Sequence, residues 1–159
     1  LTAADQKDTF NAMIEETLGE ECDYEAVRNI HEKLYEMAEE KKDEPEPLVL
    51  SKAEVKHLFA ESGVEAEKME ELEERYEESA GANTEFLASN VVNTRKFEIK
   101  APDVVIQVNP ERADLVETRI IDGRQCLVIP VDDRVEVNGI SVRTMRNGSY
   151  SGRMSEGEE

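Results

Sequence analysis

The segment with the most varied chemistry is Asn109-Pro110-Glu111-Arg112-Ala113-Asp114, which lies between two strand-like runs. It offers an amide, a guanidinium and two carboxylates, and Asp132-Asp133-Arg134 follows in a neighbouring turn. One interpretation is a recognition loop, for which the candidate residues are Asn109, Glu111, Arg112, Asp114, Asp132 and Asp133. The simpler interpretation is a structural turn, in which Pro110 fixes φ, Asn109 hydrogen-bonds locally and Arg112 pairs with a carboxylate.

Side chains that usually act as nucleophiles, general bases or metal ligands are few and scattered. The histidines, His31 and His57, and the cysteines, Cys22 and Cys126, show no metal-ligand spacing. We expect His31 to be a packed core histidine on a helix and Cys126 to be a buried, inert thiol within a strand. No phosphate loop, nucleophile elbow, zinc-protease motif or EF-hand loop is present. We therefore predict no catalytic residue, no metal and no cofactor, and the sequence favours a non-enzymatic role.

Negative charge is concentrated in the first part of the chain. The 159 residues carry a net charge of −19, of which −17 lies in residues 1–88. Carboxylates at that density repel nucleic acid and anionic lipid surfaces. The longest apolar runs are far too short to cross a bilayer, and the first twenty residues are unlike a signal peptide. We therefore predict a cytoplasmic protein with reduced thiols and neither a nucleic-acid nor a membrane partner.

The acidic part of the chain is patterned as amphipathic helices. Their apolar residues recur at helical spacing, Gly19 and Gly63 are suitable stops, and Ser51 with Glu54 forms a capping box. We expect four helices, at about residues 3–18, 24–40, 52–62 and 65–79, and a short strand at 48–50.

From Phe86 onward the apolar period changes to that of β-strands. Asp122-Gly123 and Asn138-Gly139 each predict a two-residue hairpin turn, and both registers give an apolar face. The predicted faces are Val116, Thr118, Ile120, Leu127 and Ile129 in the first hairpin, and Val135, Val137, Ile140 and Val142 in the second. The fold class is therefore α+β: an acidic helical half followed by a small antiparallel meander or partial barrel.

We predict four consecutive parts of the chain. The prolines Pro45 and Pro47 mark the first boundary, and a Gly- and Ser-containing end marks the last. The parts are an N-terminal helical pair at 1–42, a helical hairpin with short flanking strands at 43–93, an antiparallel β region at 94–143 and a disordered tail at 144–159.

Several segments resemble an uncharacterised bacterial family catalogued as domain of unknown function 4317. They are Glu16–Glu20, Asp43–Leu48, Leu87–Phe97, Pro102–Val105 and the run from Asn109–Leu115 to Ile140. The resemblance reaches about Arg143 and concerns the C-terminal part of longer family members, so we expect a portion of a longer protein. It implies no catalytic residue, substrate or cofactor, because none is established for the family.

The order of expected elements, helix, strand, helix, helix, strand, strand, is that of a winged-helix domain. The helix in the recognition position carries eight Glu in residues 65–78 against Lys68 and Arg75, so it would be repelled by DNA. Our main hypothesis is a non-enzymatic cytosolic protein-interaction or scaffolding module, whose partner has a basic surface. The alternatives are an accessory domain of an enzyme with upstream catalytic residues, and an acidic regulator that mimics nucleic acid.

Overall fold

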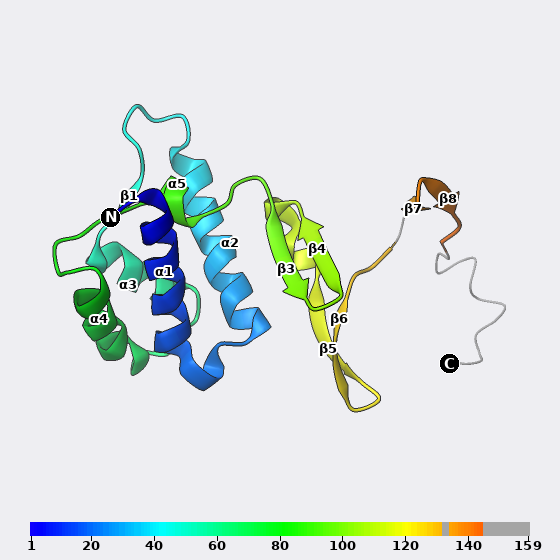
Figure 1. Cartoon of the computed structure of the whole chain (residues 1–159), viewed down its shortest axis with the longest axis horizontal. Helices are drawn as coiled ribbons and strands as arrows, with labels where there is room; N and C mark the ends of the chain where they lie inside the picture. The colour runs from blue at the N-terminus through cyan, green and yellow to red at the C-terminus, as the bar shows by residue number, and fades with distance from the viewer. Residues whose placement is uncertain (132–133, 145–159) are drawn as a thin grey trace. The chain divides into compact units, whose positions relative to one another are not determined.

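The computed structural model describes residues 1–131 and 134–144, and its contacts divide the chain into two units (Figure 1). The first unit is Leu1–Asp114, which contains the α-helices of the described residues, and the second begins at Leu115. The α+β class expected from the sequence is confirmed. None of the helices in the described part of the chain combines the length and apolar character needed to span a bilayer.

The four predicted helices are present, but the fourth begins at Lys68 rather than at about residue 65 as predicted. The long helices are α1 (Ala3–Leu18), α2 (Tyr24–Lys41), α3 (Lys52–Glu61) and α4 (Lys68–Ser79). The side chains of Thr2 and Asp23 accept backbone N–H hydrogen bonds at the first turns of α1 and α2. Ser51 and Glu54 form the complete capping box of α3. Local hydrogen bonds therefore fix where α1, α2 and α3 start, whereas α4 has no side-chain cap.

The helices of the first unit enclose a shared apolar core. Its fully buried side chains include Phe10, Met13, Ile30, Leu34, Leu58, Phe59, Leu72 and Tyr76. Phe86 lies at the centre of an aromatic group, with its ring edge-on to Phe10 at 5.7 Å and to Tyr76 at 5.6 Å. The Tyr76 hydroxyl donates a hydrogen bond to the carbonyl of Thr84, which satisfies its polar end.

Two short strands close this core, and a short helix follows them. β1 (Val49–Leu50) pairs antiparallel with β2 (Phe86–Leu87), and the short helix α5 (Ala88–Val91) begins directly after β2. The sequence pattern did not predict α5, because its geometry depends on distant contacts. The Ala88 N–H donates to the Leu48 carbonyl at 3.0 Å, and α5 packs beside α1 (Figure 1).

The first unit ends with a β-hairpin and then a 3₁₀ segment whose last residue belongs to the second unit. β3 (Phe97–Ala101) pairs with β4 (Val104–Val108), and the segment Pro110–Leu115 follows. From α2 to β4 the elements follow the order expected from the sequence, with α5 added between β2 and β3. The hairpin, however, forms its own two-stranded sheet, because α5 and the loop after it separate β3 from the β1–β2 pair.

The second unit contains two hairpins whose turns match the sequence prediction. They are β5 (Glu117–Ile121) with β6 (Arg124–Val128), and β7 (Val135–Val137) with β8 (Ile140–Val142). Asp122-Gly123 and Asn138-Gly139 have positive φ at both residues, and the pairing registers are those predicted. Among the described residues each strand pairs only within its own hairpin, so the strands form no continuous meander and no closed barrel.

The predicted apolar faces of these hairpins form, but most of their residues remain exposed to solvent. Ile120 is 71% exposed and Ile140 is 67% exposed, whereas Val116 is fully buried. Hydrophobic alternation sets which side chains share a face, and it does not determine which surface covers that face. The predicted tail lies outside the described residues except for Thr144.

Candidate functional site

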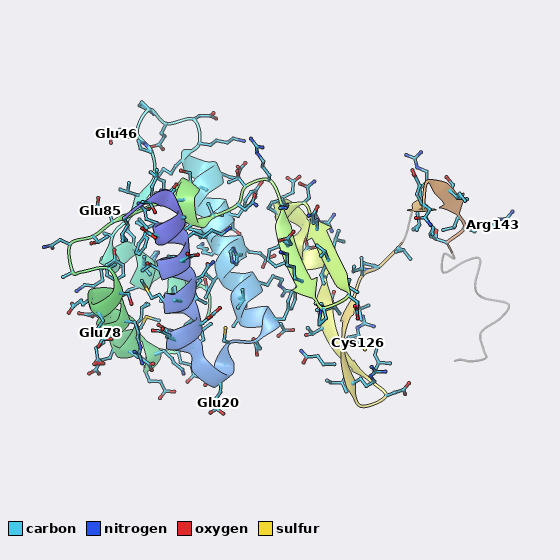
Figure 2. The ribbon with its side chains drawn as sticks, viewed as in Figure 1. Glu20, Glu46, Glu78, Glu85, Cys126 and Arg143 are labelled. Atoms are coloured by element: carbon cyan, nitrogen blue, oxygen red, sulfur yellow. The ribbon has the colours of Figure 1, made fainter. Side chains whose placement is uncertain are left out.

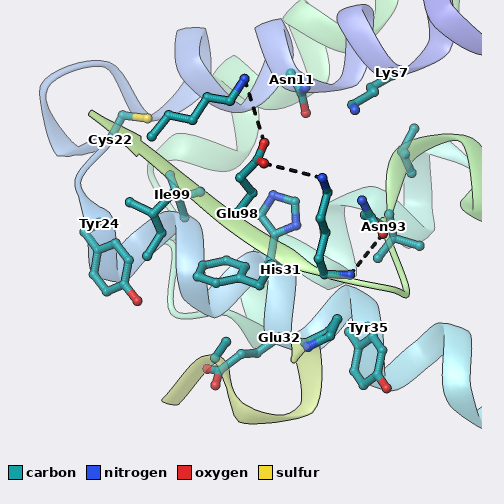
Figure 3. Close-up of a pocket in the computed structure, with 18 of the residues that line it drawn as sticks. Lys7, Asn11, Cys22, Tyr24, His31, Glu32, Tyr35, Asn93, Glu98 and Ile99 are labelled. Carbon is teal, nitrogen blue, oxygen red and sulfur yellow. Dashed lines mark hydrogen bonds and ion pairs between the residues drawn. The ribbon is translucent and has the colours of Figure 1, made fainter. Parts of the chain in front are cut away.

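A cavity of about 660 Å³ lies in the first unit, between α1, α2 and β3 (Figure 3). Figure 3 shows Lys7 and Asn11 reaching it from α1, His31 at its centre and Glu98 entering from β3. Among the residues that line it are Lys7, Cys22, Tyr24, His31, Tyr35, Asn93, Lys96, Phe97, Glu98 and Lys100. The walls thus combine aromatic rings with charged groups of both signs.

Aromatic contacts hold β3 against α2 and so shape this cavity. The Phe97 ring lies edge-on to His31, with centroids 6.0 Å apart, and to Tyr24, with centroids 6.4 Å apart. Tyr24 also accepts the Arg28 guanidinium over its ring at 5.6 Å from the centroid. His31 and Tyr35 are four residues apart on α2, and therefore both face the cavity.

His31 is a titratable group whose pKa is lowered by its surroundings in the cavity. Burial lowers its pKa, and the positive charge of Lys7 lowers it further. The imidazole is therefore neutral at pH 7 and offers one hydrogen-bond donor and one acceptor. His31 packs against Phe97 as a core histidine does, but it also faces the cavity, which the helical pattern alone did not predict.

Glu98 organises two of the lysines at the edge of the cavity. Its carboxylate lies 3.4 Å from the Lys96 ammonium and 3.9 Å from the Lys100 ammonium (Figure 3). The Gln107 amide donates to the same carboxylate at 3.1 Å and, together with Lys96, lowers its pKa. Glu98 thus remains ionised and partly neutralises both lysines.

The cysteines are not arranged as nucleophiles. Cys22 lines the cavity, and burial together with the charges of Glu15 and Asp23 raises the pKa of its thiol. A thiol with a raised pKa is protonated near neutral pH. Cys126 is half-buried rather than buried as predicted, because its hairpin is not covered within the described chain. Across the described residues, no group of three His, Cys, Asp or Glu is placed to hold a metal ion.

The predicted recognition loop presents its polar side chains to solvent. Asn109, Glu111, Arg112 and Asp114 are all exposed, while Pro110 and Ala113 are buried and contribute apolar surface to the cavity. The Arg112 guanidinium pairs with Asp114 through Nε–Oδ1 at 3.1 Å and lowers the pKa of that carboxyl. The Arg112 N–H donates to the Asn109 carbonyl at 2.8 Å. Asp132 and Asp133 lie outside the described residues.

A second surface feature is the acidic exposed side of α4 and of the turn before it. Some of its carboxylates are paired: Glu73 and Glu77 with Lys52 at 3.5 and 2.6 Å, and Glu71 and Glu78 with Arg75. By contrast, the exposed carboxylates Glu65, Glu67, Glu70 and Glu74 have no Lys or Arg nitrogen within 4.0 Å in residues 1–114, all of which are described. We call these four residues the acidic cluster. Figure 2 shows Glu78 and Glu20 pointing into solvent on the same unit.

Carboxylates of the acidic cluster interact with one another. Glu67 hydrogen-bonds to Glu65 and raises its pKa, and the charge of Glu21 raises it further. The raised pKa of Glu65 therefore comes mainly from acidic neighbours that lie close to it.

Several residues of the cavity could not be predicted from the sequence. Lys7, Tyr24, Tyr35 and Phe97 have no recognisable motif, and only the strand alternation around Phe97 indicated an inward side chain. These residues come together through contacts between α1, α2 and β3, which are distant in sequence.

Comparison with known proteins supplies a family. A family model described as Domain of unknown function (DUF4317) matches residues 1–140, which is most of the chain. No curated protein and no solved structure matches the chain.

Proposed function

Since the chain belongs to the family described as domain of unknown function DUF4317, which supplies no activity, we propose a function from the chain's own surfaces. The proposal is a non-enzymatic protein-interaction or scaffolding module that binds a partner with a basic surface. It rests on one observation above all, the acidic cluster of Glu65, Glu67, Glu70 and Glu74.

The acidic cluster is a surface that a basic partner would stabilise. Its carboxylates stand on successive turns leading into and along α4, and Glu65 has a raised pKa because of its acidic neighbours. Lys and Arg side chains of a partner would relieve this repulsion and would also steer the approach of the partner.

The uncovered hairpins of the second unit favour a protein partner over a small cation. Two-stranded hairpins are marginally stable in water, and those here expose Ile120, Val137 and Ile140. Exposed apolar surface of this kind is typical of protein contact sites. Contact with another protein would remove these side chains from water.

The geometry gives less support to a catalytic accessory domain. The Cys22 thiol in the cavity is held protonated, and the polar side chains of Asn109, Glu111 and Arg112 point into solvent rather than into the cavity. Neither feature activates a nucleophile or gathers groups around a substrate.

Site-specific photo-crosslinking in the intact protein, in its own cells, tests the proposal. A photo-reactive phenylalanine analogue is placed at position 70 within the acidic cluster or, as the control, at position 46. Glu46 is an exposed acidic residue in the loop after α2 (Figure 2). We expect a protein adduct from position 70 whose contact peptide is rich in Lys and Arg, and little of that adduct from position 46.

The outcome of this experiment separates the hypotheses. Absence of an adduct at position 70, or an adduct that forms equally at position 46, would contradict docking at the acidic cluster. Displacement of the adduct by duplex DNA would identify the partner as a nucleic-acid-binding protein and favour the nucleic-acid mimic.

A further inference from the structure

Three cations of the first unit, Lys7, Lys68 and Arg95, have no carboxylate partner among the described residues. In residues 1–114, all of which are described, most Lys and Arg side chains form an ion pair within 4.0 Å. Lys68 instead donates a hydrogen bond to the Leu18 carbonyl at 3.2 Å. The Lys7 and Arg95 side chains form neither an ion pair within 4.0 Å nor a hydrogen bond to a backbone carbonyl among the described residues. The lack of a carboxylate partner is unexpected, because the chain has 38 acidic and only 19 basic residues.

Lys7 and Arg95 lie together in a small pocket of about 300 Å³. The polar residues that line this pocket are Lys7, Ser89, Asn90, Asn93, Thr94 and Arg95, and no acidic residue lines it. Ammonium, guanidinium, hydroxyl and amide groups are the donors that proteins use to bind oxyanions. The pocket therefore has the composition of an anion site.

Hydrogen bonds fix the two sides of this pocket in place. The Gln6 side-chain oxygen accepts from the Leu87 N–H at 2.9 Å and from the Asn90 amide at 3.2 Å, which ties the start of α1 to the β2–α5 segment. The Asn93 side-chain oxygen accepts from the backbone N–H groups of Arg95 at 2.8 Å and Lys96 at 3.2 Å. Lys7 and Arg95 thus project from a backbone that is already ordered.

The small pocket adjoins the large cavity, because Lys7, Val91, Val92 and Asn93 line both. On the cavity side, Lys7 is close enough to His31 to act on its titration, and Figure 3 shows Lys7 and His31 facing the same space. The His31 imidazole makes no hydrogen bond to another of the described residues, and its ring contact is with Phe97. Its polar nitrogens are therefore available to a ligand.

We propose that the two connected pockets form one binding site for a small organic phosphate. The phosphate lies between Lys7 and Arg95, and the organic part extends toward His31 and the Tyr35 side of the cavity. A planar or ring-shaped organic part matches walls that are aromatic, and a neutral His31 supplies one donor and one acceptor to it. This site is separate from the acidic cluster, so the two proposals can fail independently.

Titration of the 159-residue chain with three probes tests the site. The probes are adenosine monophosphate, inorganic phosphate and adenosine, followed by calorimetry and by NMR of the backbone amides. We expect adenosine monophosphate to bind most tightly, phosphate roughly tenfold more weakly, and adenosine most weakly. The amide shifts should centre on Lys7, Asn93, Arg95 and His31.

Three variants test which side chains contribute to binding. Lys7→Gln and Arg95→Gln should each weaken the binding of adenosine monophosphate by roughly tenfold. Arg119→Gln is the matched control, since Arg119 is also exposed and has no carboxylate within 4.0 Å among the described residues, but lies on β5. All three positions are exposed, so the variants should fold, which their melting temperatures will show.

Four results would overturn the proposal. They are no binding by any probe, adenosine binding as tightly as its monophosphate, equal affinity for phosphate and adenosine monophosphate, and an equal loss in all three variants. The third result would exclude the organic part from the cavity, and the fourth would show that only net charge matters.

Discussion

At the scale of single residues, His31 shows how burial and a neighbouring charge change the pKa of a side chain. Its ring is packed against Phe97 on one side and faces the cavity on the other, and Lys7 approaches from α1. Both burial and the neighbouring positive charge disfavour the imidazolium, so its pKa lies below the ordinary value of about 6.5.

The first residue-scale prediction concerns the pKa of His31. In Lys7→Gln the positive neighbour is gone, so the His31 pKa should rise but stay below its ordinary value, because burial is the larger cause. An NMR titration of the imidazole measures both values. An unchanged pKa in the variant would show that Lys7 does not approach the ring in solution.

The same shift predicts how stability depends on pH. The unfolded chain binds a proton at His31 more readily than the folded chain, so folding stability should fall as pH decreases through about 6.5. Thermal unfolding at pH values on both sides of 6.5 should show this loss, and His31→Gln should remove most of it. If His31→Gln loses as much stability at low pH as the native chain, the pH dependence comes from other groups.

At the scale of elements, burial predicts which hydrophobic side chains matter for stability. Leu72 of α4 is fully buried, and Leu72→Ala should lower the free energy of unfolding of residues 1–114 by about 2–5 kcal/mol. Ile120 of β5 is 71% exposed, so Ile120→Ala should leave that value nearly unchanged. Urea unfolding followed at Tyr76 measures both. A comparable loss from Ile120→Ala would mean that the hairpin is covered in solution.

Elements with local signals could be predicted from sequence, and those that depend on distant contacts could not. The caps at Thr2 and Asp23 and the turn residues Asp122-Gly123 determine their conformation through neighbours a few residues away. The helix α5 and the cavity depend instead on contacts such as Ala88 with Leu48 and Phe97 with His31. The resemblance to the DUF4317 family was confirmed, but a family of unknown function cannot indicate which of these residues act.

At the scale of the whole molecule, charge is the property that organises the surface. The 19 Lys and Arg residues can neutralise at most half of the 38 carboxylates, and Lys56, for example, pairs with Glu73 at 2.8 Å between α3 and α4. Many exposed carboxylates of the first unit have no Lys or Arg nitrogen within 4.0 Å among the described residues, and those of the acidic cluster lie next to one another, whereas Lys7 and Arg95 line the small pocket without a carboxylate partner. Absence of DNA binding by α4 stays a prediction, which rests on the repulsion expected between its exposed carboxylates and the phosphates.

Affinity for the crosslinked partner tests the central claim most directly. Two variants lose the same charge: Glu67→Gln, Glu70→Gln and Glu74→Gln together, and Glu40→Gln, Glu46→Gln and Glu85→Gln together. The second set is equally exposed but scattered over other parts of the unit. We predict that calorimetry at low salt shows roughly tenfold weaker binding for the first variant and nearly native binding for the second. Equal weakening of both variants would contradict docking at the acidic cluster.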